Sequence, residues 1–173
     1  ENLALLARVV DSSDPARFES FLGRLPMVKS VLMVSPHGWF AQDGVMGKPD
    51  TGGQVTYVLD QARALERQLT QQFEESGIEA TPQVIVLTRL IPDDEGTTCN
   101  VPRERIHGTE SCWIVRGPFR DAGGEVVPHW ISRFQIWPYL ETFAEESKAT
   151  VITELMGKPD IIVGHYSDGN LVA

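Results

Sequence analysis

Short apolar runs bounded by turn-forming residues recur along this chain. Residues 31–34 form one such run, which ends at a Ser-Pro pair, and residues 83–90 form a second. Residues 112–117 form a weaker third run, and IIVG near the carboxyl end is a fourth. Continuous apolar runs of this length are typical of strands buried on both faces, so the pattern predicts four strands, of which the first two are expected to be buried.

Amphipathic stretches separate these runs and predict helices. The amino-terminal stretch predicts two short helices, the second of which is capped by Ser13 or Asp14. A long helix follows a Gly-Gly pair and stops at Gly77, since glycine favours the left-handed turn that ends a helix. Another helix begins at Trp137 and ends before Gly157. The apolar stripe of the long helix consists of Val55, Val58, Leu59, Ala62, Leu65, Leu69 and Phe73.

Strands that alternate with helices indicate right-handed crossovers and a parallel sheet. The predicted fold class is therefore α/β, a Rossmann-like parallel sheet with helices on both faces. Residues 1–28 are interpreted as a helical lead-in segment and residues 29–173 as the sheet domain, within which the polar stretch 92–105 is predicted to be irregular. The final letters, SDGNLVA, look like the first turn of a helix, so we expect a fragment truncated at its carboxyl end.

Composition narrows the classes of function. The net charge of −9 disfavours a nucleic-acid surface, because phosphate contacts need clustered Lys and Arg. No apolar run approaches the roughly 20 residues that cross a bilayer, so no membrane span is expected. Cys99 and Cys112 lack the spacing and the histidine neighbours of a metal site. They are interpreted as reduced thiols of a cytoplasmic protein.

Three polar, glycine-containing loops follow predicted strands, at residues 36–52, after residue 88 and after residue 164. In parallel sheets, ligands bind beyond the carboxyl ends of the strands, where these loops would meet. The first loop is also long enough to indicate a function of its own. The sequence therefore predicts a site at this edge of the sheet.

A pair of glycines, Gly52 and Gly53, stands where the first loop meets the long helix. The dinucleotide fingerprint fits no window there, and a P-loop is excluded because Pro49 follows Gly-Lys. A helix start presents unpaired N–H groups and about half a positive charge, which suits an anion or a polar hydroxyl. Asp50 and Thr51 are good N-cap residues, so ordinary helix capping is an equally open interpretation.

Two further side chains are candidates for the site, each with a plain structural alternative. His37 follows the first strand and would meet the glycine pair at the same sheet edge, although a lone histidine is more often structural. Arg133 lies among three aromatic residues, which suits sugar or phosphate recognition as well as an ordinary cation–π contact. Residues 168–170 suit capping of the last helix without any ligand.

The chain resembles the sucrose synthases, retaining glycosyltransferases of the GT-B class, in five ordered motifs. The resemblance runs from about residue 18 to the carboxyl end. It implies that residues 29–173 are part of the acceptor-side, N-terminal half of a GT-B fold and that residues 1–28 lead into it. The motifs are SPHGWFAQ, GKPDTGGQVTYVLDQARALE, VLTRLIPD with GTTC, WISRFQIWPYLE and GKPDIIVGHYSDGNLVA.

The resemblance implies that the complete protein converts sucrose and a nucleoside diphosphate, UDP or ADP, reversibly into a nucleotide-glucose and fructose. In that family the histidine of SPHG contacts the sugar, which corresponds to His37. The glycine pair, Gly52 and Gly53 with Gln54 beside it, approaches the sugar and the distal phosphate. Arg133 corresponds to an arginine on the fructose side. No metal or other cofactor is implied, and a cytoplasmic homotetramer is expected.

Other interpretations stay open. Sucrose-phosphate synthase shares the glycine-pair layout, but residues 39–43 lack the cation expected for a phosphorylated fructose. Enzymes of trehalose or glycogen synthesis are a further alternative, as is a non-catalytic oligomerisation fragment. The main catalytic residues are expected beyond residue 173, so we expect the isolated chain to be inactive. His165 stands where plant relatives often have Asn, which favours a bacterial source.

Overall fold

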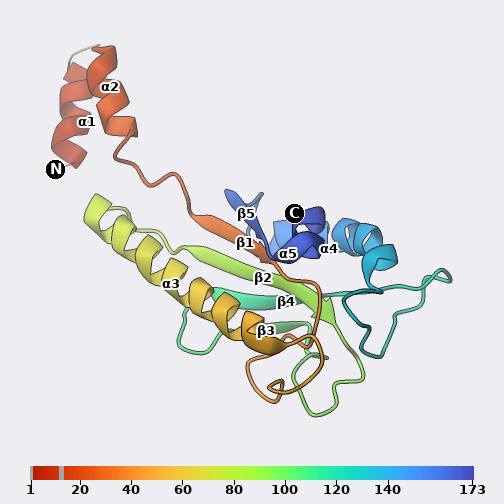
Figure 1. The fold of residues 1–173 in the computed structure, drawn as a ribbon. Helices are drawn as coiled ribbons and strands as arrows, with labels where there is room; N and C mark the ends of the chain where they lie inside the picture. The colour runs from red at the N-terminus through yellow and green to blue at the C-terminus, as the bar shows by residue number, and fades with distance from the viewer. Residues whose placement is uncertain (1, 12–13) are drawn as a thin grey trace.

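A five-stranded sheet forms the centre of the computed structural model, which describes residues 2–11 and 14–173. Neighbouring strands run parallel except β3 with β4, and the strand order is β3-β4-β2-β1-β5 (Figure 1). The predicted α/β, Rossmann-like fold class is confirmed. The strands are β1 (Ser30–Val34), β2 (Gln83–Leu90), β3 (Arg103–Arg105), β4 (Cys112–Pro118) and β5 (Ile161–Gly164). The helices are α1 (Asn2–Asp11), α2 (Pro15–Leu22), α3 (Gly52–Ser76), the 3₁₀ turn η1 (Trp137–Tyr139), α4 (Leu140–Glu154) and α5 (Tyr166–Val172).

Helices cover both faces of the sheet, as predicted (Figure 1). In β1, Val31 and Met33 pack into the apolar cluster that contains the buried face of α3. Leu32 and Val34 point the other way, into the cluster that contains α4. This alternation is the geometry of a strand, and it explains why a strand covered on both faces needs a continuous apolar run. The predicted stripe of α3 is buried except for Leu65, which is partly buried against the same cluster.

Two local predictions are wrong. The stretch 92–105, predicted to be irregular, contains β3, which pairs antiparallel with β4 at the sheet edge. A three-residue charged strand carries no apolar alternation, so the hydrophobic pattern could not predict it. The helix expected from Trp137 begins instead with the 3₁₀ turn η1, and α4 starts at Leu140. Tightening of a first turn to 3₁₀ geometry is frequent at helix ends.

The helices α1 and α2 form a hairpin that stands apart from the sheet domain (Figure 1). Asp14 caps α2, because its Oδ1 accepts a hydrogen bond of 3.0 Å from a first-turn amide. Ser13, the other candidate cap, lies outside the described residues. The hairpin exposes Leu3, Val10 and Phe18 by 82%, 77% and 51%. The helical lead-in therefore exposes apolar side chains, and its boundary at residue 28 stays a prediction.

Two expectations from composition concern the cysteines and membrane spans. Cys99 and Cys112 are both buried and unpaired, as expected. Burial raises the pKa of the Cys112 thiol to about 12, so that thiol stays protonated near neutral pH. Across the described ranges, no helix combines the length and the apolar character that crossing a membrane requires.

The chain leaves the centre of the sheet in two directions. β2 and β4 are added on one side of β1, whereas β5 pairs with its other side. In open α/β sheets, ligands bind at this point of reversal, outside the carboxyl ends of the strands. Here β1 and β5 end side by side, with Val34 paired to Gly164. The fold therefore brings the loops that follow these two strands to one place.

Arg116, on β4, ties three segments to the sheet edge. Its buried guanidinium donates hydrogen bonds to the carbonyl oxygens of Phe40 at 2.9 Å and Val101 at 2.7 Å, and it pairs with Glu104 at 2.7 Å. Desolvation raises the pKa of Glu104, but three side-chain hydrogen bonds, including that from Arg116, outweigh it and hold the pKa below its usual value. Because Phe40 belongs to the loop after β1, this network anchors that loop.

We expect Arg116→Met to lower the free energy of unfolding by about 3 kcal/mol, because it removes the charge partner of Glu104 and the donor to two carbonyl groups. Urea unfolding of the chain measures this change. The matched control is Arg105→Met, at an exposed position of β3, with an expected change below about 0.5 kcal/mol. If Arg116→Met lowers the free energy of unfolding no more than Arg105→Met does, the anchoring role assigned to Arg116 is contradicted.

Candidate functional site

A cavity of about 240 Å³ lies where the loop after β1, the start of α3 and the start of α5 meet. The five residues predicted for the site all line it, although they lie far apart in the sequence. Larger cavities occur elsewhere, such as one of about 470 Å³ against α4, which is lined mainly by apolar side chains. The small cavity is the candidate site, because it lies beyond the carboxyl ends of β1 and β5, at the point of reversal in the sheet. Its lining residues are His37, Lys48, Asp50, Thr51, Gly52, Gly53, Gln54, Arg133 and Tyr166.

The loop after β1 is packed against the domain. Trp39 and Phe40 are buried in the core beside α3. Gly38 has φ +79°, and a Cβ there would overlap the carbonyl oxygen of Asp50, so this crossing of the loop requires glycine. Thr51 Oγ1 donates a hydrogen bond to the carbonyl of Pro49 at 3.1 Å. The loop therefore holds the cavity wall in one position.

The start of α3 has no side-chain cap. Thr51 is the N-cap residue, but it makes no capping hydrogen bond, and the Asp50 carboxylate instead accepts the backbone N–H of Arg133 at 2.8 Å. The alternative that these two residues serve as ordinary caps is therefore wrong. Gly52 has φ +40°, and a Cβ on Gly52 or Gly53 would meet no atom within 4 Å. The glycine pair thus borders open space, and no side chain among the described residues caps the first-turn amides.

Arg133, on the segment before α4, also lines the cavity. Its guanidinium carbon lies 5.5 Å from the ring centre of Tyr166 and 5.2 Å from that of Phe134. The cation–π alternative is therefore realised; of the three aromatic residues near Arg133 in the sequence, Trp130, Phe134 and Trp137, it involves Phe134. No ion pair joins Arg133 to an acidic side chain within residues 2–11 and 14–173, so its charge is available to the cavity.

His37 forms a buried pair with Asp168. The His37 Nδ1 and Asp168 Oδ2 atoms are 2.6 Å apart, and the two side chains are 2% and 8% exposed. The ring of Tyr166 stands edge-on to the imidazole, with ring centres 5.0 Å apart. The prediction that residues 168–170 cap the last helix is wrong, because α5 begins at Tyr166 with His165 as its N-cap residue.

Asp168 is the residue that the sequence reasoning missed. It follows β5 as His37 follows β1, and adjacent parallel strands end at the same sheet edge. That positional signal was present in the sequence, but pairing the two residues needed the strand order.

Two more buried polar side chains, Gln54 and His165, belong to the segments that meet at the cavity. Gln54 lines it but is buried, and its Nε2 donates a 2.5 Å hydrogen bond to Ser35 Oγ. His165 is also buried, and its Nδ1 lies 2.6 Å from the Tyr57 hydroxyl oxygen. The other ring nitrogen, Nε2, has no hydrogen-bond partner among the described residues. Burial lowers the pKa of His165 below its ordinary value of 6.5, so the ring is neutral near pH 7.

Metal-ligating side chains do not gather in the part of the chain that the structure describes. No group of three or more His, Cys, Asp or Glu side chains there has an arrangement that would hold a metal ion.

Comparisons with known proteins show the class of protein to which the chain is similar. Residues 16–173 match the family model described as the first GT-B domain of sucrose synthase, which agrees with the parallel sheet and its two covered faces. The sucrose synthases of Denitrovibrio acetiphilus and Acidithiobacillus caldus are 55% and 53% identical over all 173 residues. Sucrose synthase 4 of Oryza sativa subsp. japonica is 51% identical over the same length.

The chain belongs to the sucrose synthase family, as part of its first GT-B domain. The family implied by the five motifs is therefore confirmed. The chain spans about a fifth of the length of these relatives, 22% of both bacterial proteins and 21% of the rice protein.

We expect acid to destabilise the chain partly through His165. A histidine whose pKa is lowered by folding binds a proton in the unfolded state first, so stability is complete above pH 6.5 and falls below it. His165→Asn, which keeps an acceptor for the Tyr57 hydroxyl, should show a smaller fall in unfolding free energy between about pH 7 and pH 5. Urea unfolding across this range measures the slope.

The control is His107→Asn, at an exposed position, which should leave the slope unchanged. An identical slope in wild type and His165→Asn would contradict this assignment.

Proposed function

We propose that the cavity between the ends of β1 and β5 is the fructose side of a sucrose synthase active site. The complete enzyme would transfer glucose reversibly between sucrose and a nucleoside diphosphate, giving a nucleotide-glucose and fructose. The observation that carries this proposal is the convergence of an imidazole, an uncapped helix start and an exposed guanidinium in one cavity. Membership of the sucrose synthase family supports the type of reaction.

The glycine pair is assigned to the leaving diphosphate and to one sugar hydroxyl. When the glycosidic bond to a nucleotide breaks, negative charge grows on the distal phosphate. Uncapped amides at the start of α3 are preorganised donors for that charge, and such donors contribute several kcal/mol in enzymes. Open space around Gly52 and Gly53 lets a phosphate approach the backbone closely. On this assignment the diphosphate needs no metal ion.

His37, Gln54 and Arg133 are assigned to the sugar. His37 and Arg133 both line the cavity, and the Arg133 guanidinium offers five possible N–H donors. Gln54 supports the cavity wall, because its Nε2 donates a hydrogen bond to Ser35 Oγ. Its assigned role is to line the cavity next to the glycine pair, not to bind the substrate by itself.

Unphosphorylated fructose, rather than fructose 6-phosphate, is the proposed acceptor. The one lysine that lines the cavity, Lys48, already pairs with Glu95 at 2.8 Å and lies 4.3 Å from the ring centre of Trp39. A paired lysine offers little to an incoming phosphate. This supports sucrose synthase over sucrose-phosphate synthase, as does the lack of a cation at residues 39–43.

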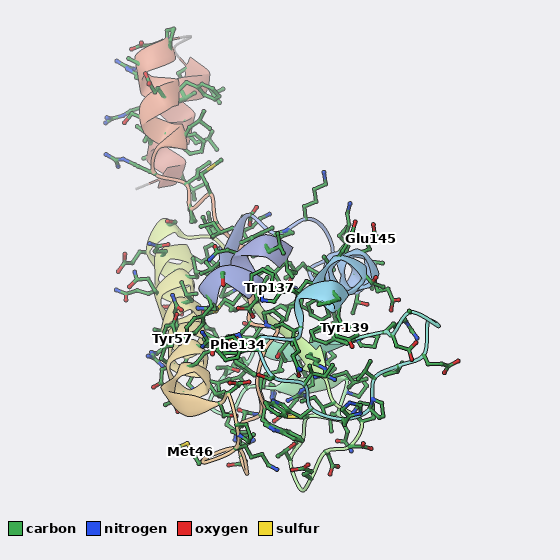
Figure 2. The ribbon with its side chains drawn as sticks, turned by 45° about the vertical axis from the view of Figure 1, so that its right-hand side comes forward. Met46, Tyr57, Phe134, Trp137, Tyr139 and Glu145 are labelled. Carbon is green, nitrogen blue, oxygen red and sulfur yellow. The ribbon has the colours of Figure 1, made fainter. Side chains whose placement is uncertain are left out.

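Exposed aromatic side chains mark the side on which the remaining wall of the cleft would lie. Figure 2 shows Tyr57 on α3 and Phe134 and Trp137 on the segment that leads to α4. They are 50%, 76% and 46% exposed. Exposed apolar groups that gather at a site are typical of surfaces that another part covers. The isolated chain would therefore bind weakly and transfer no glucose.

The finer properties of the complete protein are part of the same proposal. UDP and ADP are both candidates for the nucleotide, since base recognition belongs to the other wall of the cleft. A homotetramer is supported by the exposed apolar side chains of the α1–α2 hairpin, and light scattering of the complete protein tests it. A cytoplasmic location agrees with two buried, unpaired thiols.

The decisive experiment measures fructose released by the complete protein from sucrose with UDP, and separately with ADP. We expect release with at least one nucleotide, and equal release when EDTA is present. Synthesis from UDP-glucose is then compared with fructose and with fructose 6-phosphate as acceptor. No release with either nucleotide, together with synthesis from fructose 6-phosphate alone, would overturn the assignment.

Gly53 offers a variant that separates folding from function. Its Cβ would meet nothing within 4 Å, and its φ is not positive, so Gly53→Ala should leave the stability of the chain unchanged or raise it by about 0.5 kcal/mol. The methyl group would nevertheless occupy the approach to the amides, so we expect kcat/KM for sucrose cleavage to fall on the order of 100-fold, as when one preorganised donor is lost.

The matched control is Gly157→Ala, because Gly157 is equally uncrowded but lies after α4, outside the cavity. Thermal unfolding and initial rates are measured for both variants. Equal rates for the two variants would show that the glycine pair borders no ligand.

A further inference from the structure

The His37–Asp168 pair assigns a proton to one ring nitrogen. Asp168 is an acceptor when ionised, so the short 2.6 Å contact places the imidazole proton on Nδ1. A buried carboxylate needs such a partner, since desolvation without one is costly. In the neutral ring the second nitrogen, Nε2, is then a hydrogen-bond acceptor.

Among the described residues, none uses that acceptor. No hydrogen bond to His37 Nε2 occurs within the described ranges, although the ring lines the cavity. Nor is this nitrogen among the buried polar atoms without partners, in contrast to the Nε2 of His165. The lone pair of His37 is therefore open to a donor from the cavity, such as a sugar hydroxyl.

Asp168 itself is held by close packing. It lies in the first turn of α5, next to Gly169, whose Cβ would come within 2.5 Å of the carbonyl oxygen of Val34. The backbone N–H of His165, the N-cap residue of α5, donates to the carbonyl of Val34 at 2.8 Å. This turn cannot move away from the end of β1 without losing that bond. The carboxylate is thus a rigid support for the imidazole.

We propose that Asp168 is a positioning residue for the sugar site: it keeps His37 in the Nδ1-protonated tautomer, so that Nε2 accepts a hydrogen bond from a hydroxyl of the acceptor sugar. This inference rests on the proposed function for the identity of the sugar. The tautomer itself does not depend on it. The test therefore has one readout that needs no substrate and one that does.

The first readout is the ¹⁵N NMR spectrum of histidine-labelled chain at about pH 8.5, where an ordinary imidazole is neutral. His37→Gln identifies the His37 signals. We expect a pyrrole-type Nδ1 and a pyridine-type Nε2 in wild type. Asp168→Asn should reverse the two, because the amide N–H of Asn can donate to Nδ1. A pyridine-type Nδ1 in wild type, or no change in Asp168→Asn, would overturn the proposal.

The second readout is kinetic and uses the complete protein. We expect Asp168→Asn to lower kcat/KM on the order of 10-fold to 100-fold, as when the partner that orients a histidine is removed. In a His37→Gln background the same change should cost little more, since Asp168 acts through His37. An equal loss in both backgrounds would show that Asp168 acts independently, which contradicts the positioning role.

Asp160→Asn is the control for stability. The Asp160 carboxylate accepts hydrogen bonds from Lys29 N, Ser30 N and Ser30 Oγ at the opposite end of the sheet. Its loss should lower thermal stability without changing kcat/KM or the His37 spectrum. If wild type cleaves no sucrose, the proposed function fails, while the NMR result still decides the tautomer.

Discussion

The close approach of α5 to the end of β1 is the constraint on which the site depends. Only glycine fits at position 169, because a Cβ there would come within 2.5 Å of the carbonyl oxygen of Val34. Gly164, the last residue of β5, is crowded in the same way by the backbone of α5. This contact carries Asp168 to His37 and lets two loops from opposite directions of the sheet share one cavity. A larger side chain at either glycine would separate the loops.

Two buried arginines, Arg116 and Arg89, anchor segments that lead to the cavity. Arg116 anchors the loop after β1 at the sheet edge. Arg89, only 2% exposed, donates to the carbonyl of His129 at 2.6 Å and lies over the ring of Phe119. Burial lowers the pKa of Arg89 to about 10, which still leaves it charged at neutral pH. Because Arg133 follows His129 closely in the sequence, this bond also steadies the segment that carries the exposed guanidinium. The buried charges of Arg89 and Arg116 thus hold the segments around the cavity, in which the charge of Arg133 stays available.

Side chains that would ordinarily cap α3 are used elsewhere, and this leaves the helix start open. Asp50 holds the backbone of Arg133, and Thr51 holds the loop. Each of these bonds shapes the cavity and at the same time leaves the first-turn amides without a side-chain partner. A site for an anion or a hydroxyl thus arises from where the capping groups point, combined with the missing side chains of Gly52 and Gly53.

The sequence by itself determined the family, the α/β class and the elements with strong periodicity, such as β2 and the stripe of α3, because burial on one or two faces leaves a direct apolar pattern. It also named five of the nine residues that line the cavity, from the loop after β1, the glycine pair and the family resemblance. Only the tertiary structure decided that Asp168 pairs with His37, that Asp50 turns away from the helix start, and that three charged residues form β3. These contacts join segments far apart in the chain, and local patterns carry no information on which strand ends become neighbours.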